Sequence, residues 1–169
     1  MKLLRPMMAG LLITTASAVY AEQITVSSVQ VDAELSDVTN KKALDYYPDL
    51  KTDLEAAITE ELFPLAGEDG YTVKARISEI SLDGQPLIDD KGFNTLNGWV
   101  YVYPPEADQM ASADNSAEPE PQQEFNIELT ATATGEGIMP GGDDYYRAMV
   151  AAFAQSTGEK IRDMTAVVN

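Results

Sequence analysis

The stretch Tyr47–Leu65, YPDLKTDLEAAITEELFPL, predicts an amphipathic helix, and the other segments are interpreted from it outward. Its apolar residues recur at helical spacing and share one face: Leu50, Leu54, Ala57, Ile58 and Leu62. Pro48 and Pro64 suit the start and the end of such a helix. Burying large apolar side chains contributes about 1.5–3 kcal/mol each, so this helix requires a hydrophobic surface to pack on.

The segments on both sides of this helix supply that surface as a sheet. Period-2 alternation and dense β-propensity predict four strands, at Ile24–Leu35, Tyr71–Leu82, Trp99–Tyr103 and Phe125–Thr134. A phase slip predicts a bulge near Ser27 and Ser28, and the stretch before Trp99 resembles an irregular polar connection. A second amphipathic helix is expected at Asp143–Met164. The order β-α-β-β-β-α predicts an α+β fold: a four-stranded, mostly antiparallel sheet with two helices packed on one face.

Residues 1–21 have the features of a bacterial signal peptide. Lys2 and Arg5 form a basic start, a short apolar run follows, and small residues lead to cleavage after Ala21. Cleavage there leaves residues 22–169 as a single domain, in the periplasm or outside the cell. No stretch of that mature chain approaches the ~20 apolar residues of a membrane span, so we expect no transmembrane segment in it.

Composition excludes several classes of function. The chain carries a net charge of −17, which becomes −19 when Lys2 and Arg5 leave with the signal peptide. Such a surface repels nucleic acid, so no nucleic-acid partner is expected. With no cysteine and no histidine there is no disulfide, thiolate or imidazole chemistry. The acidity favours solubility, and a basic partner or bound divalent cations are the alternative interpretations.

Residues 106–123 differ from the rest of the chain. They are rich in Ala, Ser, Glu and Pro, with Met110 as their one large apolar side chain. Such a segment buries too little surface to offset its ordering entropy, so we predict a disordered acidic loop at the tip of a hairpin. A partner-binding acidic loop is the alternative.

The third predicted strand supplies the best candidate binding patch. If Val100 and Val102 face the helices, the aromatic residues of this strand stand on the open face of the sheet: Trp99, Tyr101 and Tyr103. Lys74 and Arg76 of the neighbouring strand would share that face. Aromatic rings beside cations suit a partner strand, a glycan or a lipid head group. The opposite arrangement, with the aromatic residues in the core, remains open at this point.

The other candidates carry weaker signals. The glycines of residues 135–142 match neither a dinucleotide-binding nor a Walker loop, and Asp143 and Asp144 follow them in place of a Lys-Ser/Thr pair. The acidic groups at 68–69 and 83–90 lack EF-hand spacing, so no metal site is expected. No carboxylate pair or serine–lysine pair has a catalytic signature, so no cofactor and no enzyme activity are predicted.

An Asp-Tyr-Tyr tripeptide precedes or begins each predicted helix, at residues 45–47 and 144–146. It is interpreted as a coincidence and not as a trace of duplication. In each pair one tyrosine is expected to pack inward and the other to cap the sheet edge.

The element order and the exported leader resemble small β-α-β-β-β-α domains of bacterial envelope accessory proteins, of the TolB amino-terminal and CsgG kind. No signature motif is shared, so the resemblance assigns no residue a role. It implies a non-catalytic periplasmic module that binds an envelope protein or a lipid-like ligand. The alternatives are an acidic ligand- or cation-binding protein and, third, an enzyme with an unrecognised carboxylate site.

Overall fold

The computed structural model describes residues 24–33, 47–82, 93–105, 119–130 and 142–167. The expected signal peptide and most of the expected disordered loop lie outside these ranges. The elements follow one another as β1 (Val26–Asp32), α2 (Leu50–Leu62), the 3-10 turn η1 (Phe63–Leu65), β2 (Tyr71–Leu82), β3 (Phe93–Tyr103), β4 (Gln123–Thr130) and α4 (Gly142–Val167). The predicted β-α-β-β-β-α order is confirmed.

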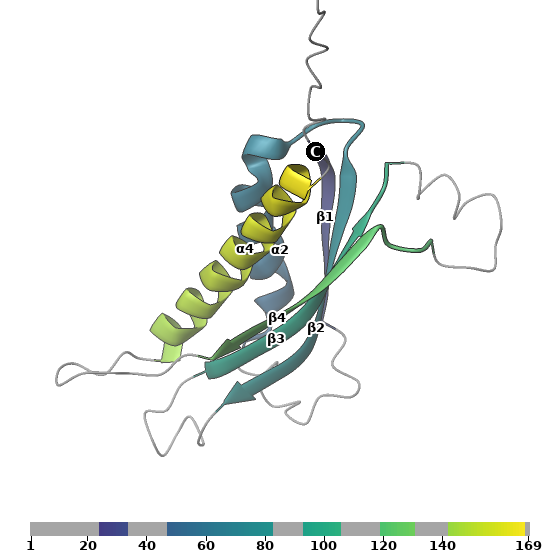
Figure 1. Cartoon of the computed structure of the whole chain (residues 1–169). Helices are drawn as coiled ribbons and strands as arrows, with labels where there is room; N and C mark the ends of the chain where they lie inside the picture. Colours follow the sequence, from purple (N-terminus) through teal and green to yellow (C-terminus); the bar gives the residue numbers. More distant parts are fainter. Residues whose placement is uncertain (1–23, 34–46, 83–92, 106–118, 131–141, 168–169) are drawn as a thin grey trace, which may run out of the picture.

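The four strands form one sheet in the order β1-β2-β3-β4 (Figure 1). β1 runs parallel to β2, whereas β2 with β3 and β3 with β4 form antiparallel pairs. A parallel pair requires a long crossover, and the segment containing α2 provides it. The sheet is therefore four-stranded and mostly antiparallel, as the sequence predicted.

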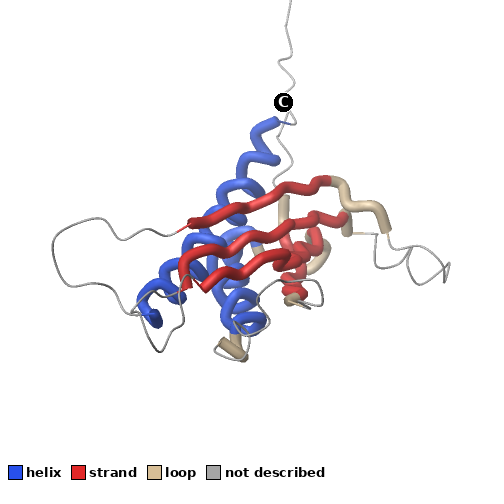
Figure 2. The backbone as a smooth tube through the Cα atoms, turned by 90° about the horizontal axis from the view of Figure 1, so that it is seen from below, coloured by secondary structure: helices blue, strands red, loops and turns tan. Residues whose placement is uncertain are grey.

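Both helices lie on the same side of the sheet (Figures 1 and 2). The α2 residues that face the sheet are at most 2% exposed: Leu50, Leu54, Ile58 and Leu62. They form one core with Phe153 and Ile161 of α4 and with Val73 and Val100 of the sheet, all fully buried. The sequence pattern identified these faces correctly because each helix buries a single apolar stripe.

The two helices run in the same direction, side by side (Figure 1). Tyr146 near the start of α4 contacts Asp53 near the start of α2, and Arg162 near the end of α4 contacts Glu61 near the end of α2. Gly158 permits this approach, because a Cβ atom there would lie 2.6 Å from the Cγ of Glu61. A glycine that lowers helix propensity is thus placed where Glu61 of the neighbouring helix leaves little room for a Cβ atom.

β3 is longer than predicted. It begins at Phe93, whereas the sequence analysis began it at Trp99 and assigned the preceding residues to an irregular connection. The side chain of Asn97 explains the difference, since its amide donates to the Glu79 carboxylate at 2.9 Å and its Oδ1 accepts from the Leu129 N–H at 3.3 Å. Polar residues that suggested a loop are bonded to the neighbouring strands instead.

The ends of the other elements differ from the prediction by a few residues. β1 ends at Asp32, and β4 begins two residues early, at Gln123, while its predicted end at residues 131–134 lies outside the described part. The predicted bulge in β1 is confirmed: the register shifts between Val26 and Ser28.

Candidate functional site

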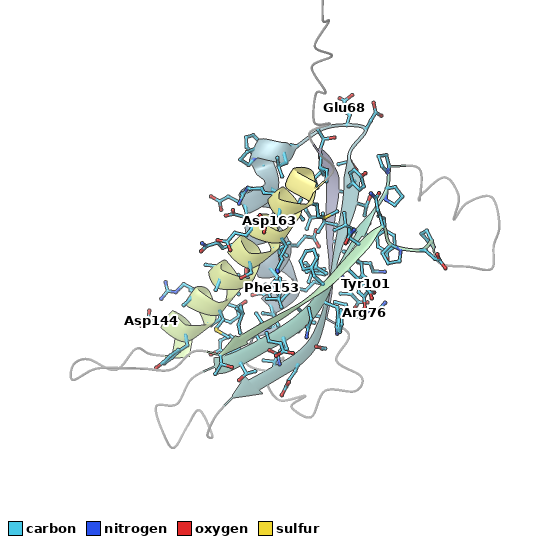
Figure 3. All side chains as sticks on the ribbon, viewed as in Figure 1. Glu68, Arg76, Tyr101, Asp144, Phe153 and Asp163 are labelled. Carbon is cyan, nitrogen blue, oxygen red and sulfur yellow. The ribbon has the colours of Figure 1, made fainter. Side chains whose placement is uncertain are left out.

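The patch predicted for binding lies on the face of the sheet that points away from the helices, called here the open face. Val100 and Val102 are fully buried in the core. Alternation along β3 therefore places its aromatic side chains on the open face: Trp99, Tyr101 and Tyr103. Trp99 is 39% exposed, and the two tyrosines are half-buried. Figure 3 shows Tyr101 and Arg76 on the side of the sheet away from Phe153.

The two cations of the patch stand beside these rings. In the pairing of β2 with β3, Lys74 lies opposite Tyr101 and Arg76 lies opposite Trp99. The Arg76 guanidinium is 5.9 Å from the ring centroid of Tyr101 and 3.9 Å from the Asp32 carboxylate on β1. An exposed cation–π contact of this kind contributes about 0.5–1 kcal/mol, so it orients the guanidinium without burying it. The structure thus brings all five predicted residues onto one face.

Acidic and amide side chains border the aromatic column on its other side. Across β3, Glu124 of β4 lies opposite Tyr101 and Asn126 lies opposite Trp99. The Asn126 amide donates to the Glu128 carboxylate at 2.8 Å. The open face therefore changes from cationic on β2 to acidic on β4 over two strand spacings, about 9–10 Å. A partner that matches it needs charges of both signs around an apolar or aromatic centre.

A second feature, which the sequence analysis did not select as a site, is a cleft between the N-terminal halves of α2 and α4, called here the helix cleft. Its volume is about 600 Å³. The rings of Tyr47 and Tyr146 stack in it, with centroids 4.3 Å apart and planes 3° from parallel. The Tyr146 hydroxyl donates a hydrogen bond to the Asp53 carboxylate. Of the residues that the structure describes, Ala57, Asp143, Arg147, Val150 and Ala151 also line it.

Both tyrosines of the helix cleft keep their protons. Burial raises the pKa of the Tyr146 phenol, and the hydrogen bond and the charge of Asp53 raise it further. Burial also raises the pKa of Tyr47, with a smaller contribution from the Asp143 carboxylate. The phenols are neutral at physiological pH, so the charge that the described residues bring to the cleft comes from its carboxylates and one guanidinium.

The two stacked tyrosines of the helix cleft belong to the repeated Asp-Tyr-Tyr. The third residue of each copy, Tyr47 and Tyr146, points inward, and the two stack on each other. The sequence did not predict this contact, because nothing local in the sequence links residues so far apart in the chain.

Phe63 is the most exposed large apolar residue of the described part, at 76%. It borders a shallow hollow on the outer side of α2, together with Thr59 and Glu60. The sequence analysis gave it no role. It offers an exposed aromatic residue away from the open face, which makes it a useful control.

Within the described ranges, no three acidic side chains converge in a way that would hold a metal ion. The acidic group at residues 83–90 lies outside those ranges. So do residues 135–141 of the glycine-rich segment. No described helix is both long enough and apolar enough to cross a membrane. Compared with protein-family models and with curated proteins, the chain matches none.

Proposed function

We propose that this protein is a non-catalytic interaction module of the bacterial periplasm that binds a protein of the cell envelope through the open face of its sheet. The observation that carries the proposal is the column of Trp99, Tyr101 and Tyr103 on that face, beside Lys74 and Arg76. Trp, Tyr and Arg are the residues most enriched at the energetic centres of protein interfaces. Their gathering on the side of the sheet that neither described helix covers supports a docking role.

Charge favours a protein over a lipid as the partner. The chain carries a net charge of −17, which opposes approach to anionic head groups. Lys74 and Arg76 are also accompanied on the same face by Asp32, Glu124 and Glu128. A protein surface can match this mixture of signs, whereas an anionic bilayer meets only the cations favourably.

The periplasmic part of the proposal rests on the leader and on the resemblance to envelope accessory domains. Cleavage after Ala21 would give a mature protein that starts at Glu22. Mass spectrometry of the protein recovered from the periplasmic fraction tests this part. A mass that includes residues 1–21, or a protein retained in the cytoplasm, would contradict it.

Site-specific photocrosslinking in intact cells tests the docking face. A photoreactive residue at Asn126, exposed on the open face, should trap one partner protein, whereas the same residue at Thr59, exposed on the outer side of α2, should not. Adding Trp99→Ala or Arg76→Glu should abolish the adduct at Asn126. Phe63→Ala, the matched loss of an exposed aromatic residue, should leave it unchanged.

Folding must be checked in the same variants. Since Trp99 and Arg76 lie at the surface, we expect each change to cost about 1 kcal/mol, a shift of about 2–4 °C in melting temperature. If Trp99→Ala folds normally and still forms the crosslinked adduct at Asn126, the docking proposal is wrong. If the protein instead floats with lipid vesicles, and Trp99→Ala or Arg76→Glu abolishes this flotation, the ligand of the open face is a lipid.

A further inference from the structure

The helix cleft is built like a ligand site and has no part in the docking proposal. Its volume of about 600 Å³ falls within the range of about 300–1,000 Å³ that small-molecule sites occupy. One wall is the stacked pair Tyr47 and Tyr146, and the aliphatic side chains of Val150 and Ala151 add apolar surface. The Asp53 carboxylate is held in place by the Tyr146 hydroxyl.

The sign of the charge in the helix cleft decides what class of ligand fits. Two helix N-termini meet at this end, each with about half a positive charge, and they alone would favour an anion. Arg147 adds one positive charge but is paired with Asp144 at 3.1 Å. Four carboxylates outweigh these charges: Asp53 and Asp143 line the cleft, Asp49 acts on the Tyr146 phenol, and Asp144 is the partner of Arg147. Among the described residues the balance is about two negative charges beside aromatic rings.

We propose that the helix cleft binds a small organic cation, an amine or quaternary ammonium compound with a hydrocarbon body. The cation would lie near Asp53 and Asp143, and its hydrocarbon part would contact the stacked tyrosines and Val150. Carboxylates attract the charge and aromatic faces attract both parts of such a molecule, whereas an anion is repelled. A volume of about 600 Å³ suits a metabolite-sized molecule.

Titration of the mature protein with benzyltrimethylammonium tests this site. Benzyl alcohol and benzenesulfonate are the neutral and anionic probes of similar size. We expect the cation to bind at least about tenfold more tightly than the alcohol, measured by calorimetry and by shifts of the tyrosine ring signals in NMR spectra. The indole signal of Trp99 should stay unchanged, because that ring lies on the other side of the sheet.

Two variants and one control assign the binding to the cleft. Asp53→Asn still accepts the Tyr146 hydrogen bond but loses its charge, so we expect affinity for the cation to fall about fivefold to tenfold. Tyr47→Leu removes one ring and should weaken binding even if Asp53→Asn folds poorly. Glu55→Gln removes the same charge on the opposite side of α2 and should change affinity less than about twofold.

Several outcomes would overturn the proposal. These are equal affinity for the alcohol, tighter binding of the sulfonate, and equal losses in Asp53→Asn and Glu55→Gln. Trp99→Ala should leave the titration unchanged, so failure here is distinguishable from failure of the docking face.

Discussion

Replacing Gly98 by alanine tests how closely α4 is packed on β3. A Cβ atom at Gly98 would lie 2.9 Å from the backbone oxygen of Arg76 and 3.1 Å from the Cζ atom of Phe153. Phe153 is fully buried, so its ring cannot turn away into solvent. The added methyl group must therefore push a core ring and a strand backbone apart.

The magnitude follows from two opposing effects. Adding a methyl group to a filled core costs about 1–3 kcal/mol. Replacing glycine by alanine restricts the unfolded chain and returns about 0.4–1 kcal/mol. We therefore expect Gly98→Ala to lower the free energy of unfolding by about 1–2 kcal/mol, or about 2–8 °C in melting temperature for a domain of this size.

A double-mutant cycle separates this contact from general damage. Phe153→Leu removes the tip of the ring and leaves space for the new methyl group, so the double variant should be more stable than the sum of the single changes by about 1 kcal/mol. The matched cycle pairs Gly98→Ala with Ile161→Val, which lies eight residues, about 12 Å, further along α4 and should be additive. Urea unfolding followed by circular dichroism measures both cycles. Equal coupling in the two cycles would refute the packing argument.

Two further predictions test the helix pair, and a third tests the exposed side of α2. Folding raises the pKa of Tyr146 above the free value of 10.0, so the folded state holds this proton more tightly and the free energy of unfolding should decline as pH rises above 10. Urea unfolding of Tyr146→Phe should show a smaller decline, to which Tyr47, whose pKa is also raised, still contributes, and an unchanged decline would contradict the assignment. Arg162→Gln breaks the 2.6 Å ion pair with Glu61 and should cost at most about 1 kcal/mol, less in high salt; a larger, salt-independent loss would show a different role. Phe63→Ser, at an exposed position, should change the free energy of unfolding by no more than about 0.5 kcal/mol, and a loss of several kcal/mol would mean that Phe63 is covered in solution.

The sequence was sufficient for the features that repeat along one element. The apolar stripe that includes Leu50 and Leu54 predicted the buried side of α2, and the alternation around Val100 and Val102 placed the aromatic column on the open face. In both cases one period and one burial rule decide the orientation of every residue in the element. The candidate docking face was therefore accessible from sequence, although its function remains a proposal.

Features that depend on contacts between elements were missed. Nothing in the local sequence shows that Asn97 finds partners on two neighbouring strands, so a polar stretch of β3 was assigned to a connection. The stacking of Tyr47 on Tyr146 depends in the same way on the relative placement of two helices. Periodicity reports burial, but it does not report which distant side chain fills a given contact.

The direction of the helices nevertheless follows from the sheet, and the helix cleft follows from that direction. β1 is parallel to β2, and β4, separated from β2 by two antiparallel pairings, runs the same way. Each of β1 and β4 is followed by a helix that returns along the same face of the sheet, so α2 and α4 must start at the same end (Figure 1). Two helix N-termini side by side concentrate positive partial charge, which accounts for acidic residues such as Asp49 and Asp143 in their first turns and before them. The carboxylates exceed what the two dipoles require, and this excess, beside the paired tyrosines, is the physical reason to expect a cation in the cleft.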